Sequence, residues 1–286
     1  MTSNNTDNKK PIQEFQVAAI QMASGPNVSS NLYEAQRLIG MAADAGAKLI
    51  VLPENFAIMG MDEKDKVAVK ENAGSGRLQN FLAEAAKKHA VWIVGGTIPI
   101  ACDDANKIRA AALIYDDCGT LVGRYDKTHL FDVHIPESGD HFVESQTIEA
   151  GNQVKVIDTP FGKLGVAICY DLRFPEVFRL MVQQGVEFIA LPSAFTAITG
   201  RAHWEILVRA RAIENLSYVI AADQGGYHIN GRESHGESMI VDPWGNVLDR
   251  LASGSGFVTA KLSRKTISDI RRNFPALNHR KFNISQ

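Results

Sequence analysis

The sequence has 286 residues, of which 45% are hydrophobic and 22% are charged, so it can bury the core of one large domain or of two ordinary ones. A formal net charge of −2 argues against binding to nucleic acid or to an anionic membrane surface. The three cysteines, Cys102, Cys118 and Cys169, are odd in number and widely spaced, which argues against a disulfide framework and predicts a reducing, cytoplasmic setting.

The first half of the chain predicts strands that alternate with helices. Residues 1–13 are polar, lack the apolar segment of a signal peptide, and are expected to form a flexible tail. Apolar patterning then predicts a strand over 15–22, a helix from about Leu32 with Asn31 and Glu34 as a capping pair, a strand over 47–55, a helix around 78–85, a strand over 91–100 and a hairpin over 109–127. The apolar stretches are too short to span a bilayer.

The second half begins with a predicted long loop, 128–152. It is followed by an expected hairpin over 154–169, a helix that begins at Pro175, a strand over 186–194, a helix from His203 to about Glu214, a strand over 217–224, a hairpin over 238–251, a strand near 257–261 and a helix over 263–273. This mixture predicts one α/β domain over 14–286, with two mixed sheets packed together and helices outside. The last 12 or so residues lack periodicity, and we expect them to pack on a partner subunit.

Three reactive residues follow directly after apolar strands. Glu54 follows LIVLP, Lys127 follows LVGRYD, and Cys169 follows LGVAI. Strand ends commonly form the rim of the active site in layered α/β folds. A lysine favours the thiolate of a nearby cysteine, and a carboxylate can take the thiol proton and pass it to a leaving amine. Each residue alone has a simpler interpretation, as a core cysteine, a helix-starting acid and a surface lysine, so the pattern by itself indicates only a cysteine hydrolase as one option.

Other chemistries have weak support in the sequence. It contains no phosphate-binding GxxxxGK[ST] motif and no GxGxxG placed between a strand and a helix. His129, His134 and His141 share the predicted loop but lack metal-ligand spacing, so we predict no metal site there.

The segments LPEN (52–55), DKTHLFD (126–132) and ICYDLRFPE (168–176) resemble, in this order, the three catalytic segments of the nitrilase superfamily of carbon–nitrogen hydrolases. The resemblance implies a four-layer αββα sandwich, a homodimer, and no metal or organic cofactor. It implies that Glu54, Lys127 and Cys169 form a catalytic triad. It also nominates Glu144, in FVES (142–145), as a second glutamate that orients the lysine or binds substrate.

Residues 192–215 and 239–245 resemble the Nit branch, and the segment around Thr199–Glu205 is most similar to deaminated-glutathione amidases. Those enzymes hydrolyse the amide of an α-keto analogue of glutathione to 2-oxoglutarate and cysteinylglycine. The expected mechanism uses the Tyr170 backbone N–H together with the lysine to hold the oxyanion. Five residues are candidates for binding a small anionic amide substrate: Arg173, Phe195, Thr196, Arg201 and His203.

Several alternatives stay open at this point. Within the enzyme class they are an ω-amidase acting on 2-oxoglutaramate, an amidase for another small linear amide, and a nitrilase. Outside it they are an N-acyltransferase, which would pass the same thioester to an amine, and a non-catalytic binding protein on the same fold.

Overall fold

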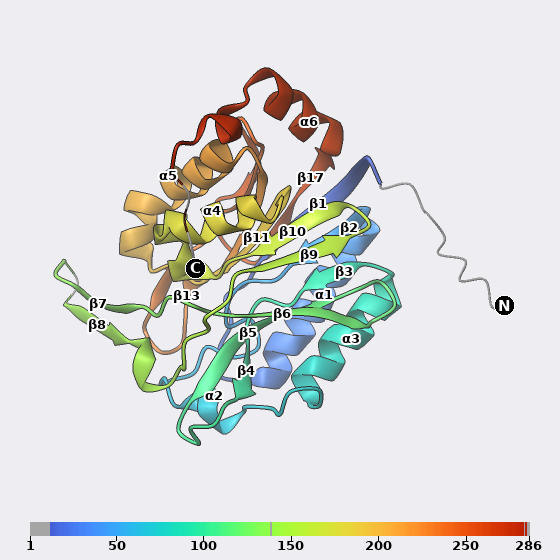
Figure 1. The fold of residues 1–286 in the computed structure, drawn as a ribbon. Helices are drawn as coiled ribbons and strands as arrows, with labels where there is room; N and C mark the ends of the chain where they lie inside the picture. The colour runs from blue at the N-terminus through green and yellow to red at the C-terminus, as the bar shows by residue number, and fades with distance from the viewer. Residues whose placement is uncertain (1–11, 138, 283, 285–286) are drawn as a thin grey trace.

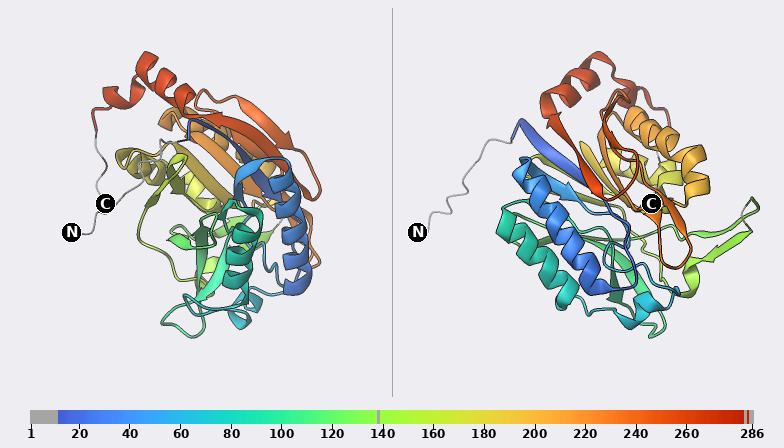
Figure 2. Two further views of the ribbon diagram at one scale, coloured as in Figure 1. Left: turned by 90° about the vertical axis from the view of Figure 1, so that its right-hand side faces the viewer. Right: turned by 180° about the vertical axis from the view of Figure 1, so that it is seen from behind.

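The computed structural model describes residues 12–137, 139–282 and 284. Two β-sheets face each other in the middle of the molecule, and helices cover their outer faces (Figures 1 and 2). This is the predicted four-layer α/β sandwich. Of the predicted tail, residues 1–11 lie outside the described residues.

The first sheet contains most of the N-terminal strands and one strand from the C-terminal end. In spatial order it consists of β17 (Gly256–Ser263), β1 (Glu14–Gln21), β2 (Ala47–Val51), β3 (Trp92–Val94), β5 (Ile108–Tyr115) and β4 (Ile98–Ala101), with β6 (Leu121–Asp126) also paired to β5. Strands β1, β2 and β3 are parallel, so their carboxyl ends lie at the same edge of the sheet.

The second sheet consists, in spatial order, of β16 (Val247–Leu251), β15 (Ser238–Val241), β12 (Tyr218–Asp223), β11 (Phe188–Ser193), β10 (Gly162–Val166) and β9 (Lys155–Thr159). Its central strands β10, β11 and β12 are parallel. Two short hairpins lie outside the sheets: β7 (Asp132–Ile135) with β8 (Asp140–Val143), and β13 (Gly225–Tyr227) with β14 (Glu233–His235).

Side chains that alternate along β1 separate the two apolar layers of the core. Phe15, Val17 and Ala19 belong to the cluster between the sheets, whereas Ala18 and Ile20 belong to the cluster beneath the N-terminal helices. Successive side chains of a strand point to opposite faces, so a strand buried on both faces is apolar throughout. That requirement explains why the strand segments are continuous apolar runs in the sequence.

The helices form the two outer layers. They are α1 (Val28–Asp44), α2 (Asp65–Ala68), α3 (Arg77–His89), α4 (Pro175–Gln183), α5 (Ala197–Asn215) and α6 (Arg264–Asn273), with short 3₁₀ helices η1 (Glu144–Gln146), η2 (Cys169–Arg173) and η3 (Ala276–His279). Buried residues of α1 and α3 pack on the first sheet, and those of α4 and α5 pack on the second. Pro175 is the first residue of α4, as predicted. Among the described residues no helix has the length and apolar character needed to cross a membrane.

Three local predictions were wrong. The cap of α1 is Asn27, whose side chain accepts the N–H of Ser30, while Asn31 lies inside the helix and bonds to the backbone of Gly25 and Ala57. The predicted strand 91–100 is two strands, because Gly96 turns the chain with a positive φ at a point where a Cβ would meet the Pro53 carbonyl. The predicted loop 128–152 contains the β7–β8 hairpin and η1, whose segments of three or four residues are too short to be told from a loop in sequence.

Candidate active site

Cys169 lies at a sharp turn between β10 and η2. Its φ angle is +46°, a left-handed conformation that costs a non-glycine residue about 1–2 kcal/mol. The turn places the thiol at the wall of a cavity, although only 8% of the residue is exposed. Backbone strain of this kind is concentrated at functional positions.

A buried carboxylate holds this turn in place. Asp171 is fully buried and accepts hydrogen bonds from the backbone N–H of Ile168 (2.9 Å) and of His129 (3.0 Å) and from the Tyr125 hydroxyl (2.7 Å). The Nδ1 of His129 lies 2.7 Å from the same carboxylate, and the His129 ring stacks on Phe174. Through these hydrogen bonds Asp171 links the segment that contains Lys127 to the turn that contains Cys169. The sequence reasoning passed over Asp171 although it lies within ICYDLRFPE.

Lys127 joins two carboxylates at the floor of the cavity. Its Nζ lies 2.7 Å from Oε1 of Glu54 and 2.9 and 2.8 Å from Oε1 and Oε2 of Glu144. The side chains of Lys127 and Glu54 are 1% and 3% exposed. Glu144 also accepts the N–H of Phe131 at 2.7 Å, so it is fixed on both sides and is not a solvated loop acid. The structure thus brings together the three strand-end residues and the second glutamate that the sequence nominated.

Burial and neighbouring charges set the protonation of this group. Burial by itself would lower the pKa of Lys127, but the Glu144 and Glu54 carboxylates raise it well above its ordinary value. Lys127 is therefore an ammonium ion. Burial raises the pKa of Glu54, and the Glu144 charge raises it further, against the opposing effect of Lys127. Glu54 is consequently a better proton acceptor than an exposed glutamate.

The thiol of Cys169 is protonated in the resting site. Burial raises its pKa well above the usual value, and the Glu54 charge adds to this, while Lys127 and the Ala194 backbone act in the opposite direction. A thiol of this kind needs a base before it can act as a nucleophile. Glu54 is the base of this group, because its buried carboxylate lies close enough for its charge to raise the pKa of the thiol.

The cavity above these residues has a volume of about 460 Å³. Its lining includes Tyr170, Arg173, Phe195 and Thr196, all of which the sequence nominated. The Arg173 guanidinium lies over the rings of Tyr170 (5.8 Å) and Phe195 (5.5 Å). Among the described residues no carboxylate forms an ion pair with Arg173.

Two other nominated residues do not line the cavity. Arg201 and His203 are exposed on the first turns of α5, whose inward face carries Gly200 and Trp204. His203 comes no closer to the cavity than a contact of 3.3 Å between its Nδ1 and Arg173. The helix begins six residues earlier than predicted, at Ala197, and this shift changes which of its residues face inward.

Sequence reasoning missed the charged residues at the cavity mouth. Glu63 and Lys66 line it from the segment before and within α2, and Arg232 lines it from the β13–β14 turn. The Oε1 of Glu63 lies 2.5 Å from Nη1 of Arg232, and its Oε2 lies 2.6 Å from Nζ of Lys66. Arg232 is 169 positions from Glu63, so no local spacing could have revealed the pair.

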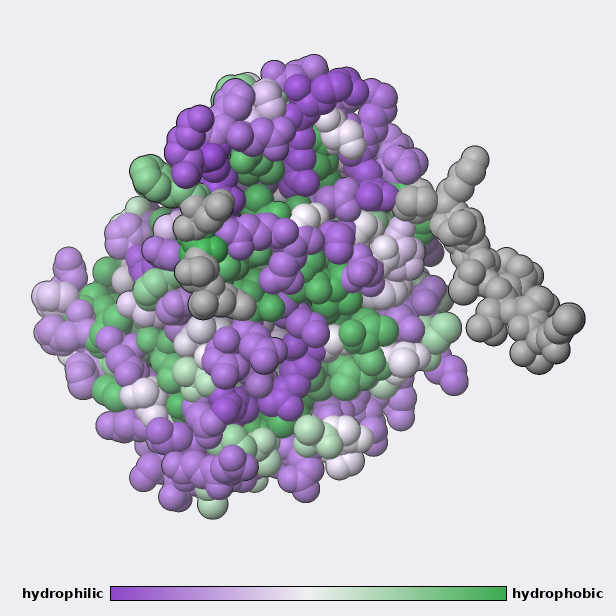
Figure 3. Space-filling model, viewed as in Figure 1, coloured by the Kyte–Doolittle hydropathy of each residue, from purple (hydrophilic) through white to green (hydrophobic). Residues whose placement is uncertain are grey.

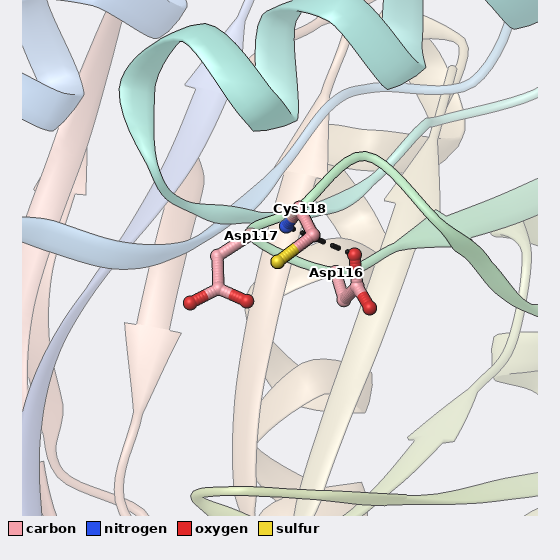
Figure 4. A group of neighbouring side chains, drawn as sticks. All are labelled: Asp116, Asp117 and Cys118. Atoms are coloured by element: carbon pink, nitrogen blue, oxygen red, sulfur yellow. Dashed lines mark hydrogen bonds between the residues drawn. The ribbon is translucent and has the colours of Figure 1, made fainter.

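The three loop histidines lie in two different surroundings. His129 bonds to Asp171, and His134 and His141 face each other across the β7–β8 hairpin. One group of possible ligands, Asp116–Cys118, lies in the β5–β6 turn (Figure 4). The Asp116 carboxylate there accepts hydrogen bonds from the backbone N–H groups of Cys118 and Thr120. Aspartates commonly stabilise turns in this way.

Known proteins resemble this chain over nearly its whole length. The carbon–nitrogen hydrolase family matches residues 16–272. A Synechocystis protein named deaminated glutathione amidase is 40% identical over 274 residues, which are 95% of this chain and all of that protein. The human protein of the same name is 38% identical over 268 residues, 93% of this chain and 82% of its own. The structure of Nit3 from Saccharomyces cerevisiae, a nitrilase-superfamily member, aligns with a TM-score of 0.85 and 31% identity over 95% of this chain and 98% of that one. The chain therefore belongs to the carbon–nitrogen hydrolase family of the nitrilase superfamily.

Proposed function

We propose that this protein hydrolyses the amide bond of deaminated glutathione through a thioester on Cys169. The observation that carries the chemistry is the group of Glu54, Lys127 and Cys169 in the lining of one cavity, where an ammonium ion contacts a basic carboxylate and both charges act on a buried thiol. The relatives with this name, similar over almost all of the chain, support the substrate.

In the first half of the reaction Glu54 takes the thiol proton, and the sulfur of Cys169 forms a bond to the amide carbon. The carbonyl electron pair moves to oxygen, where Lys127 and the Tyr170 backbone N–H stabilise it. Glu54 then gives its proton to the nitrogen, the C–N bond breaks, and the amine leaves.

In the second half Glu54 takes a proton from water, and the resulting hydroxide attacks the thioester carbon. The C–S bond breaks, the acid is released, and the proton on Glu54 returns to the sulfur. Glu144 positions Lys127, since both of its oxygens bond to Nζ.

Arg173 is the cation best placed to bind the α-keto acid end of the substrate. It lies in the cavity wall four residues from Cys169, and two aromatic rings orient its guanidinium. Phe195 and Thr196 contribute the adjoining wall.

A panel of amides tests the substrate. It consists of deaminated glutathione, 2-oxoglutaramate, glutamine, glutathione and a nitrile, compared by kcat/KM. We expect deaminated glutathione to rank first, and the assignment fails if glutathione or the nitrile does. Adding hydroxylamine separates hydrolysis from acyl transfer, because an acyltransferase would turn over rapidly only with the added amine.

We also propose a cytoplasmic homodimer built on one domain over residues 14–286. Three features support the dimer: Ile206 and Ile213 expose apolar side chains on α5, Trp244 and Phe274 pack edge to face beside that helix, and Figure 3 shows further apolar surface on the face of Figure 1. The three free cysteines fit a reducing compartment. Sedimentation of the protein and of Ile206→Glu tests the dimer, since the charge should shift the mass to that of a monomer.

A further inference from the structure

The cavity has charged groups at two levels. Glu54, Lys127 and Cys169 are buried at its floor, whereas Arg232, with 42% of its side chain exposed, lies at its mouth. A row of aromatic rings connects the levels: Phe142 lies 5.2 Å from the Arg232 guanidinium, and Phe131 follows at 5.1 Å. The Tyr170 ring lies 5.1 Å from the Phe131 ring, and the Arg173 guanidinium lies over Tyr170. Arg173 and Arg232 are therefore at opposite ends of one aromatic wall.

Two cations at the mouth share one carboxylate in the ion pairs of the described residues. One carboxylate, Glu63, binds both Lys66 and Arg232, and these two charges lower its pKa to about 2 although burial opposes them. Arg232 uses Nη1 in this contact, and among the described residues its Nε and Nη2 groups have no hydrogen-bond acceptor, nor do two of the three donors of Lys66. Asp140 and Glu233 also line the cavity and are exposed like Arg232, so water and salt screen their charges as they screen that of Arg232, and the case for an anion site rests on the hydrogen-bond donors of Arg232 and Lys66.

We propose that Arg232 and Lys66 bind the distal carboxylate of an extended amide, the one that leaves with the amine. This inference rests on the proposed function, because cysteinylglycine is such a leaving group. A substrate with its acyl carboxylate on Arg173 and its amide at Cys169 extends its other half along Phe131 and Phe142 toward Arg232. The pair selects long anionic amides over short ones that release only ammonia.

The cavity volume agrees with this selection. About 460 Å³ suits a ligand of the size of a short peptide. Deaminated glutathione has roughly twice as many non-hydrogen atoms as 2-oxoglutaramate, which would leave the mouth of such a cavity empty. The mouth groups therefore contribute to binding only for the longer substrate.

The test changes the protein and the substrate separately. Arg232→Gln and Lys66→Gln are assayed with deaminated glutathione, with its C-terminal carboxamide, and with 2-oxoglutaramate. Arg37→Gln is the matched control, because Arg37 is 44% exposed and pairs with one glutamate on α1, away from the cavity. A charge-assisted contact predicts that Arg232→Gln lowers the ratio of kcat/KM for deaminated glutathione over 2-oxoglutaramate by about 10- to 100-fold. On the wild-type enzyme, kcat/KM for the carboxamide should be lower than that for deaminated glutathione by a similar factor. Arg232→Gln should lower kcat/KM for the carboxamide only a little further.

Two results overturn the inference. One is a wild-type enzyme that hydrolyses the carboxamide as well as the acid. The other is a variant that slows both substrates by the same factor, as a merely structural arginine would. Failure of the proposed function has a different signature, since the wild-type enzyme would then fail to hydrolyse deaminated glutathione in the first place. The carboxamide comparison needs no variant, so it decides the matter even if Arg232→Gln does not fold.

Discussion

Lys127→Met removes the positive charge that Glu54 and Glu144 share while keeping the length of the side chain. The two carboxylates would then face each other in a site where the Glu54 side chain is 3% exposed and that of Glu144 is 15% exposed. Breaking a buried ion pair by removing one partner costs about 3–5 kcal/mol, because the remaining charge is left uncompensated. We expect a loss of about this size in the free energy of unfolding at pH 7.5, together with loss of amidase activity.

The loss should shrink as the pH falls. Burial and Glu144 hold the folded-state pKa of Glu54 above its ordinary 4.5. Without Lys127, the folded state takes up protons at a higher pH than the unfolded state, so acid relieves the charge and restores stability. Urea unfolding of the variant and the wild type at pH 7.5 and at pH 5 measures the loss in the free energy of unfolding at each pH. The control is Lys265→Met, whose side chain is 79% exposed and pairs with Asp269, and it should change stability by less than about 1 kcal/mol. A Lys127→Met variant as stable as the wild type at pH 7.5 would refute the charge balance described for the site.

Three further predictions concern the same cavity. Asp171→Asn should lower stability by about 2–3 kcal/mol and kcat at least tenfold, because the amide nitrogen that replaces one carboxylate oxygen cannot accept that oxygen's hydrogen bonds, which hold the Cys169 turn; unchanged kcat would contradict the role given to Asp171. Arg173→Met should raise KM for α-keto acid amides by about 10- to 100-fold with a much smaller change in kcat, and steady-state kinetics that show the reverse would place its effect in the chemical step. In the wild-type enzyme kcat/KM should fall with acid as Glu54 is protonated, with a midpoint above the ordinary 4.5, whereas a midpoint below it would exclude Glu54 as the base.

Much of the fold could be predicted from the sequence, because strands buried on both faces have to be continuous apolar runs. That is why the parallel strands were found, and why Glu54 and Cys169 could be recognised after β2 and β10, while Lys127 follows the antiparallel strand β6. The β7–β8 hairpin was missed because each of its strands has only four residues, too few for the alternation of Asp132–Ile135 to stand out from the polar segment around it.

The parts of the site that could not be predicted depend on contacts between distant segments. Asp171 meets His129 across 42 positions, and Arg232 meets Glu63 across 169. No periodicity or spacing connects such pairs, and only the packing of the two sheets brings them together. Arg201 and His203 lie outside the cavity lining for a simpler reason, since the start of α5 determines which of its residues face the cavity.

The central claim is that Cys169 forms a thioester with the acyl half of the substrate. The most direct measurement is mass spectrometry of the enzyme quenched in acid during turnover of deaminated glutathione, with Cys169→Ala as the control. We predict an added 2-oxoglutaryl group on the peptide that contains Cys169, and neither adduct nor activity in the folded alanine variant. An alanine variant that keeps full activity would contradict the account.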